Sequence, residues 1–131
     1  MSTYELCHLP ETICLDRFNE AIVFAIKFLD LDLDISIEFE DLPEYHFGSA
    51  DYDELDGEIE ASVAISSNIS EVDAITTMFH ELVHIRQFHT GMLESGPQLR
   101  WLGETYDCDY KDLPWEKEAY AKEKELATVC A

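Results

Sequence analysis

A chain of 131 residues, with 47% hydrophobic and 28% charged residues, has the size and composition of one globular domain, so we expect residues 1–131 to form a single domain. Its formal net charge of −21 at pH 7 argues against nucleic-acid binding, because phosphate backbones are bound by clustered lysine and arginine. A membrane span is not expected either, because the longest uninterrupted apolar run, Ala21 to Ile26, is far shorter than the roughly 20 residues required.

The cysteines and the N-terminus both favour a cytoplasmic protein. Cys7, Cys14, Cys108 and Cys130 form no Cys-x-x-Cys pair, so we expect reduced thiols rather than a zinc knuckle or a redox motif. The first residues lack the basic-then-apolar pattern of a signal peptide.

The acidic charge has two interpretations. It can simply keep the surface strongly solvated, or acidic segments such as residues 51–56 can attract a basic substrate or a basic partner protein.

The first half of the chain is predicted to form one helix and three strands. Alternating apolar residues predict strands over residues 35–39, 45–52 and 59–65, with a turn over residues 53–57. A helix over residues 16–29 is predicted by apolar residues at helical spacing, namely Phe18, Ile22, Ala25, Ile26 and Leu29.

A longer helix is expected from Ser70 to Gly91. Ser70 can cap its start, with Asp73 three residues later, and Gly91 is a natural stop. Its apolar positions at helical spacing are Val72, Ile75, Met78, Phe79, Leu82, Val83 and Phe88. A short strand over residues 99–102 and a final helix from Pro114 to about Thr128 complete the chain.

The long helix contains the pattern His80-Glu81-Leu82-Val83-His84. Two imidazoles four residues apart lie on one face of a helix, where both can bind one Zn²⁺ ion. The intervening Glu81 can then take a proton from a zinc-bound water, whose pKa zinc lowers to about 7, and pass it to the leaving amine. The pattern therefore predicts a zinc hydrolase with Glu81 as its general base.

A zinc site of this kind needs a third protein ligand. His89 lies five residues after His84 and so points to another side of the helix, which favours a surface or supporting role. Glu116 is the preferred third ligand, because it shares a helix face with Ala119, Tyr120 and Glu123. Glu118 is the alternative, although its face carries charged residues. An oxyanion-stabilising hydroxyl could come from Tyr106, Tyr110 or Tyr120, and Tyr110 is our choice among them.

The expected fold class is α+β, with the element order of a minimal zincin. An N-terminal helix would precede a small, mainly antiparallel sheet of three to four strands, followed by the motif helix and a C-terminal helix that carries the third ligand. The strand over residues 58–66 would be either a sheet edge above the metal, where an extended peptide could bind, or simply core.

The motif His80-Glu81-Leu82-Val83-His84, followed by Pro114-Trp115-Glu116-Lys117-Glu118-Ala119, resembles the small gluzincin-type metallopeptidases, many of them predicted phage proteins. It is more distantly similar to the ImmA/IrrE-type metallopeptidases. The resemblance covers roughly residues 58–125. It implies one zinc ion per chain and a third ligand in a Glu-x-x-Ala pattern, which Glu116 with Ala119 and Glu118 with Ala121 both fit. For a phage-encoded chain, the location would be the host cytoplasm.

Two functions from different classes follow from these residues. The first is a zinc-dependent endopeptidase that acts on a peptide or protein substrate. The second is an acidic zinc-binding module, an inhibitor or nucleic-acid mimic, without significant turnover. The intact Glu81 favours the first, because a binding module needs no general base.

Overall fold

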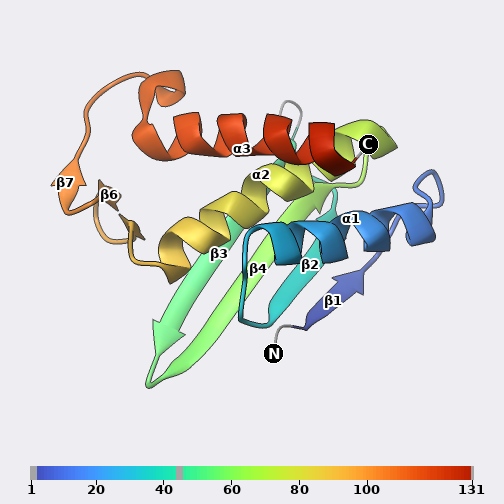
Figure 1. Cartoon of the computed structure of the whole chain (residues 1–131), viewed down its shortest axis with the longest axis horizontal. Coiled ribbons are helices and arrows are strands. Elements are labelled where there is room, and N and C mark those ends of the chain that lie inside the picture. The colour runs from blue at the N-terminus through green and yellow to red at the C-terminus, as the bar shows by residue number, and fades with distance from the viewer. Residues whose placement is uncertain (1–2, 44–45, 131) are drawn as a thin grey trace.

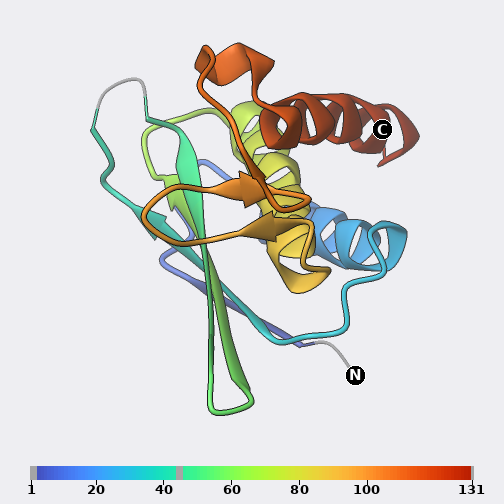
Figure 2. The same cartoon turned by 90° about the vertical axis from the view of Figure 1, so that its left-hand side faces the viewer.

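A four-stranded sheet forms the base of the molecule, with the helices on one of its faces (Figure 1, Figure 2). The computed structural model describes residues 3–43 and 46–130. The strands are β1 (Tyr4–Cys7), β2 (Ile35–Glu40), β3 (Gly48–Leu55) and β4 (Glu58–Ser66), arranged in the order β1-β2-β4-β3.

The sheet is mixed, so the prediction of a mainly antiparallel sheet is wrong. β2 pairs in parallel with both β1 and β4, and only β3 pairs in antiparallel fashion, with β4. The parallel pair β1–β2 is joined through helix α1 (Leu15–Phe28), because parallel neighbours need a long crossover connection. β1 itself was not predicted, since four residues give too short a pattern to recognise.

β3 and β4 form a hairpin with a two-residue turn. Asp56 and Gly57 both have positive φ angles, 54° and 81°, as a tight hairpin turn requires. Strand β3 therefore continues to Leu55, whereas a turn was predicted from residue 53. The predicted start of this strand, Tyr45, lies outside the described residues. Because β3 pairs with the outer side of β4, β4 is an interior strand, and the two edge strands of the sheet are β3 and β1.

The main core lies between the sheet and the helices. The predicted apolar face of α1 is buried, and so are alternating residues of β2 and β4, such as Ile37 and Val63. Helix α2 (Glu71–His89) carries the motif and crosses the helix-covered face of the sheet, in contact with β3 and β4 (Figure 1). Ser70 caps it by accepting a hydrogen bond from the backbone N–H of Asp73, as predicted.

Helix α2 is enclosed from a second side by α3 (Pro114–Cys130), which packs across it (Figure 1). Most residues in the middle of α2 are consequently buried, polar ones included. Val72 is an exception to the predicted apolar face, because it lies in the first turn and is 72% exposed.

Between α2 and α3 the chain forms a second, small antiparallel sheet and one 3-10 turn. The strands of this second sheet are β5 (Leu93–Glu94), β6 (Arg100–Trp101) and β7 (Glu104–Thr105), and the 3-10 turn is η1 (Tyr110–Asp112). The predicted strand over residues 99–102 corresponds to β6.

The predictions of reduced cysteines and of no membrane span can be compared with the described residues. Cys7, Cys14 and Cys108 are free thiols, as expected, whereas the side chain of Cys130 is not among the described ones. Within residues 3–43 and 46–130, none of the helices has the length and apolar character needed to cross a membrane.

Candidate metal centre

Helix α2 turns the two motif histidines toward each other. His80 and His84 are 8% and 7% exposed, and their Nε2 atoms lie 3.2 Å apart. This proximity follows from the four-residue spacing, which places side chains one above the other on a helix.

Helix α3 brings Glu116 to the same point. Its Oε1 atom lies 2.9 Å from Nε2 of His80 and 3.1 Å from Nε2 of His84, and its side chain is buried. Glu118 lies elsewhere, where its carboxylate accepts a hydrogen bond from Gln87 and pairs with Arg86. Of the two glutamates that the sequence offered, Glu116 is therefore the one beside the histidines.

Each histidine is held from behind by a hydrogen-bond acceptor. Nδ1 of His80 lies 2.9 Å from Oε1 of Glu123, and Nδ1 of His84 lies 2.8 Å from Oε1 of Gln87. The amide of Gln87 has its orientation fixed, because its Nε2 donates to the Trp115 carbonyl and to Glu118. Both Nδ1 atoms therefore carry a proton, so Nε2 is the atom of each ring that can offer a lone pair to a metal once any proton on it is released.

Three lone-pair atoms thus converge in a buried space: the two Nε2 atoms and Oε1 of Glu116. Their separations of 2.9, 3.1 and 3.2 Å are close to the distance of about 3.3 Å between two ligands of a tetrahedral zinc ion. Two histidines and one glutamate are also a known donor set of catalytic zinc sites. The residues therefore fit a single metal ion in both chemistry and size.

The pKa values reflect the same convergence. Burial lowers the pKa of His80, but its hydrogen bonds with Glu116 and Glu123 outweigh burial and raise this pKa to about 9. Burial alone would raise the pKa of Glu116, but its hydrogen bonds with His80 and His84 outweigh burial and hold this pKa at about 2. The centre therefore attracts a positive charge, which a proton supplies when no metal does.

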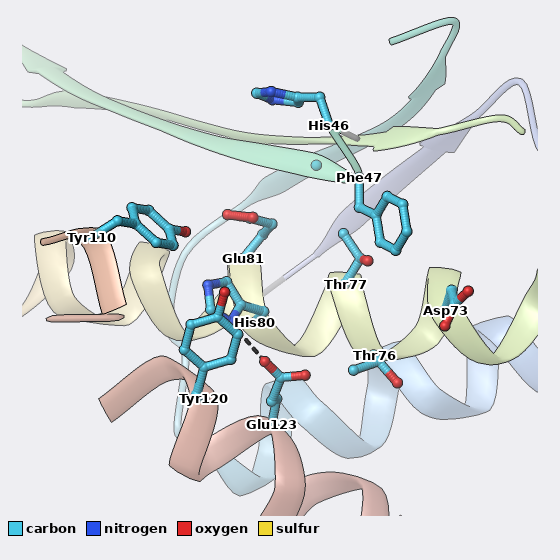
Figure 3. Close-up of a pocket in the computed structure, with 11 residues that line it drawn as sticks. His46, Phe47, Asp73, Thr76, Thr77, His80, Glu81, Tyr110, Tyr120 and Glu123 are labelled. Carbon is cyan, nitrogen blue, oxygen red and sulfur yellow. Dashed lines mark hydrogen bonds and ion pairs between the residues drawn. The ribbon is translucent and has the colours of Figure 1, made fainter. Parts of the chain in front are cut away.

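Glu81 lies next to this centre and is 7% exposed. Burial raises the pKa of its carboxyl group, despite the opposing effect of the two histidines. Figure 3 shows this carboxylate pointing away from α3, toward β3.

Gly48 allows β3 to begin directly above this part of α2. A Cβ atom at Gly48 would lie 2.5 Å from a methyl carbon of Thr77 and 2.8 Å from the carbonyl oxygen of Ala64, closer than packed atoms come. The same Cβ would be 3.5 Å from Cγ of Glu81. The glycine thus lets the edge strand approach the motif helix.

A cavity of about 560 Å³ opens beside His80 and Glu81 (Figure 3). Tyr110 and Tyr120 line it, and the Tyr120 ring packs 4.6 Å from the His80 ring, measured between centroids. Burial and the nearby carboxylate of Glu116 raise the pKa of Tyr110, so its hydroxyl keeps its proton and can act as a donor. Tyr106 packs against Trp115 and does not line the cavity. His89 also lies apart, where its Nδ1 meets the Tyr52 hydroxyl at 2.9 Å.

Three residues of the site were not singled out from the sequence: Gln87, Glu123 and Gly48. Spacing contains a signal for the first two. Gln87 follows His84 by three residues on the same helix, and Glu123 follows Glu116 by seven, which is two full turns. For Gly48 the sequence contains no such signal, because the close approach is made by residues of two other elements.

Comparisons with protein-family models, with curated proteins and with solved structures found no match to this chain.

Proposed function

We propose that this protein is a zinc-dependent peptidase. The observation that carries the proposal is the convergence of three buried lone-pair atoms, from His80, His84 and Glu116, beside a buried carboxylate and an open cavity. Without a metal, a proton shared with the histidines must offset the charge of the buried Glu116 carboxylate, whereas one metal ion would accept a lone pair from all three groups.

In this proposal His80, His84 and Glu116 hold the metal. Glu123 and Gln87 keep the two histidines in the tautomer that presents Nε2, as hydrogen-bonded partners of metal-binding histidines commonly do. When bound, zinc would lower the pKa of water to about 7 and polarise a substrate carbonyl.

Glu81 then acts as the general base. Its buried carboxylate accepts a proton from the attacking water and gives it to the departing amine, and the raised pKa suits both transfers. The protonated hydroxyl of Tyr110 would stabilise the negative charge that develops on the attacked carbonyl oxygen.

The substrate would be a peptide or protein in extended form. β3 is the edge strand that lies beside Glu81, because a Cβ atom on Gly48 at its start would be 3.5 Å from Cγ of Glu81. The free backbone of β3 can therefore pair with a peptide near the site of cleavage. This role falls to β3 rather than to β4, because β4 is interior.

The test is a comparison of zinc content and peptide cleavage in wild type, Glu81→Gln and Glu94→Gln. Glu94 is an exposed glutamate on β5, so its variant controls for the loss of one charge. We expect Glu81→Gln to keep one zinc ion and to lose cleavage of a mixed peptide library, read by mass spectrometry, while Glu94→Gln cleaves as wild type does. A zinc-loaded wild type that cleaves no peptide would instead favour the acidic binding module.

A further inference from the structure

The cavity beside the candidate metal centre extends along α2, away from the metal ligands and under the start of β3 (Figure 3). Its floor is one face of the helix, because Asp73, Thr77 and His80 follow each other at four- and three-residue spacing. Asp73 precedes His80 by two turns, or about 10 Å along the axis. A short side chain bound near the metal would not reach Asp73, whereas a long one could.

Acidic groups line this extension, and none of the described residues around it is lysine or arginine. Asp73 is exposed at the far end. Glu123 is buried in the wall, and only its Oε1 is engaged, with His80. Its other carboxylate oxygen makes no hydrogen bond with any described residue, and Figure 3 shows it turned away from His80, toward Thr76.

A second and independent feature is the hydroxyl of Thr77. The residue is only 8% exposed, yet within the described part of the chain its hydroxyl has no hydrogen-bond partner. Since the structure leaves no fully enclosed side-chain oxygen or nitrogen unsatisfied, this hydroxyl must face the cavity that the residue lines. A polar group of a substrate in the cavity can therefore form a hydrogen bond with it, without displacing any bond within the protein.

We propose that this extension, formed by Asp73, Thr77, Glu123 and Phe47, is a subsite for a lysine or arginine side chain of the substrate. The proposal rests on the proposed function and names its substrate class: peptides with a basic residue next to the cleaved bond. The cationic end of the side chain would lie between Asp73 and the free oxygen of Glu123, with Thr77 accepting a hydrogen bond. Phe47, a half-exposed ring in the wall, would cover the apolar stem of the side chain.

The test measures binding rather than turnover, so that it does not depend on catalysis. Zinc-loaded Glu81→Gln protein is titrated into fluorescein-labelled alanine–glycine peptides with a central lysine, arginine, norleucine or glutamate. Norleucine matches the length of lysine without its charge. A further peptide has a central norleucine and a terminal lysine, which keeps the net charge and moves it out of the subsite. We expect the central lysine and arginine peptides to bind about 5- to 10-fold more tightly than both norleucine peptides.

Added substitutions identify the residues responsible. Asp73→Asn and Thr77→Val should each reduce the preference for central lysine at least about twofold, with zinc content unchanged. Asp16→Asn is the matched control, because Asp16 is also an exposed acid in the first turn of a helix but lies outside the cavity. Equal binding of the central lysine and norleucine peptides, or an equal loss in Asp16→Asn and Asp73→Asn, would overturn the subsite. If the preference holds while zinc-loaded wild type cleaves no peptide, only the peptidase proposal fails.

Discussion

Gln87 is the residue whose replacement tests most sharply how the candidate metal centre is built. It is fully buried, and its amide joins three groups: Nδ1 of His84 at 2.8 Å, the Trp115 carbonyl at 2.9 Å and Glu118 at 3.2 Å. Methionine has nearly the same length and volume but none of these hydrogen bonds. The change Gln87→Met therefore removes the acceptor that fixes the His84 tautomer without opening a large cavity.

Two losses are expected from Gln87→Met. The buried N–H of His84 loses its partner, which costs about 1–3 kcal/mol of unfolding free energy in the metal-free protein. Zinc affinity should fall by about 10- to 100-fold, the usual effect of removing a hydrogen-bonded partner of a metal-binding histidine.

The assays are urea unfolding of the metal-free protein and competition for zinc with a chromophoric chelator. Gln98→Met is the matched control, because Gln98 is the only other glutamine and is exposed. If Gln87→Met binds zinc as tightly as Gln98→Met does, the hydrogen bond to His84 does not orient the metal centre and the reasoning is refuted.

Three further predictions concern the edge strand and the titrating groups. Gly48→Ala should destabilise the protein by about 1–3 kcal/mol and lower kcat/KM, because the added Cβ would clash with Thr77 and the Ala64 carbonyl. Thermal unfolding measures the change in stability, and equal stability of Gly48→Ala and wild type would contradict the prediction. Since the pKa of metal-free His80 is about 9, zinc binding at pH 7 should release about one proton or more, and the zinc affinity should fall as the pH is lowered. Calorimetry in two buffers of different ionisation enthalpy measures the number of protons released. A binding heat that is the same in both buffers would contradict the prediction. The hydrogen bond from Arg17 lowers the pKa of Glu71 below its ordinary 4.5. The stabilising contribution of the Glu71 carboxylate is therefore present above about pH 4.5 and is lost as the pH falls through the lowered pKa. The difference in stability between wild type and Glu71→Gln should shrink below about pH 4.5, and a constant difference from pH 7 to pH 3 would contradict the prediction.

The sequence allowed the local part of the site to be predicted. His80, Glu81 and His84 are related by helix geometry alone, and the capped start at Ser70 and the stop at Gly91 place that helix correctly. The choice between Glu116 and Glu118 was different in kind. It depends on how α3 is rotated against α2, which is set by packing of residues such as Trp115 and Ala119 that are far from α2 in sequence.

In the sheet, too, local features were predictable from the sequence and tertiary ones were not. Alternation in β2 and β4 identified these strands, but it contains no information about which strands are neighbours. The edge position of β3 and the parallel pairing of β2 with β1 and β4 are tertiary results. The close approach of β3 to α2 at Gly48 likewise depends on contacts with Thr77 and Ala64, and no sequence pattern around residue 48 predicts those contacts.

The central claim is that His80, His84 and Glu116 together bind one metal ion. The most direct test is the zinc content of purified protein, measured by elemental analysis after dialysis against a weak chelator, for wild type, Glu116→Gln and Glu118→Gln. The two variants lose the same charge two residues apart on one helix, so they differ only in which carboxylate remains. We expect one zinc ion per chain in wild type and in Glu118→Gln, and a large loss in Glu116→Gln. Zinc retained at one per chain in Glu116→Gln, or absent from the wild type, would contradict the claim.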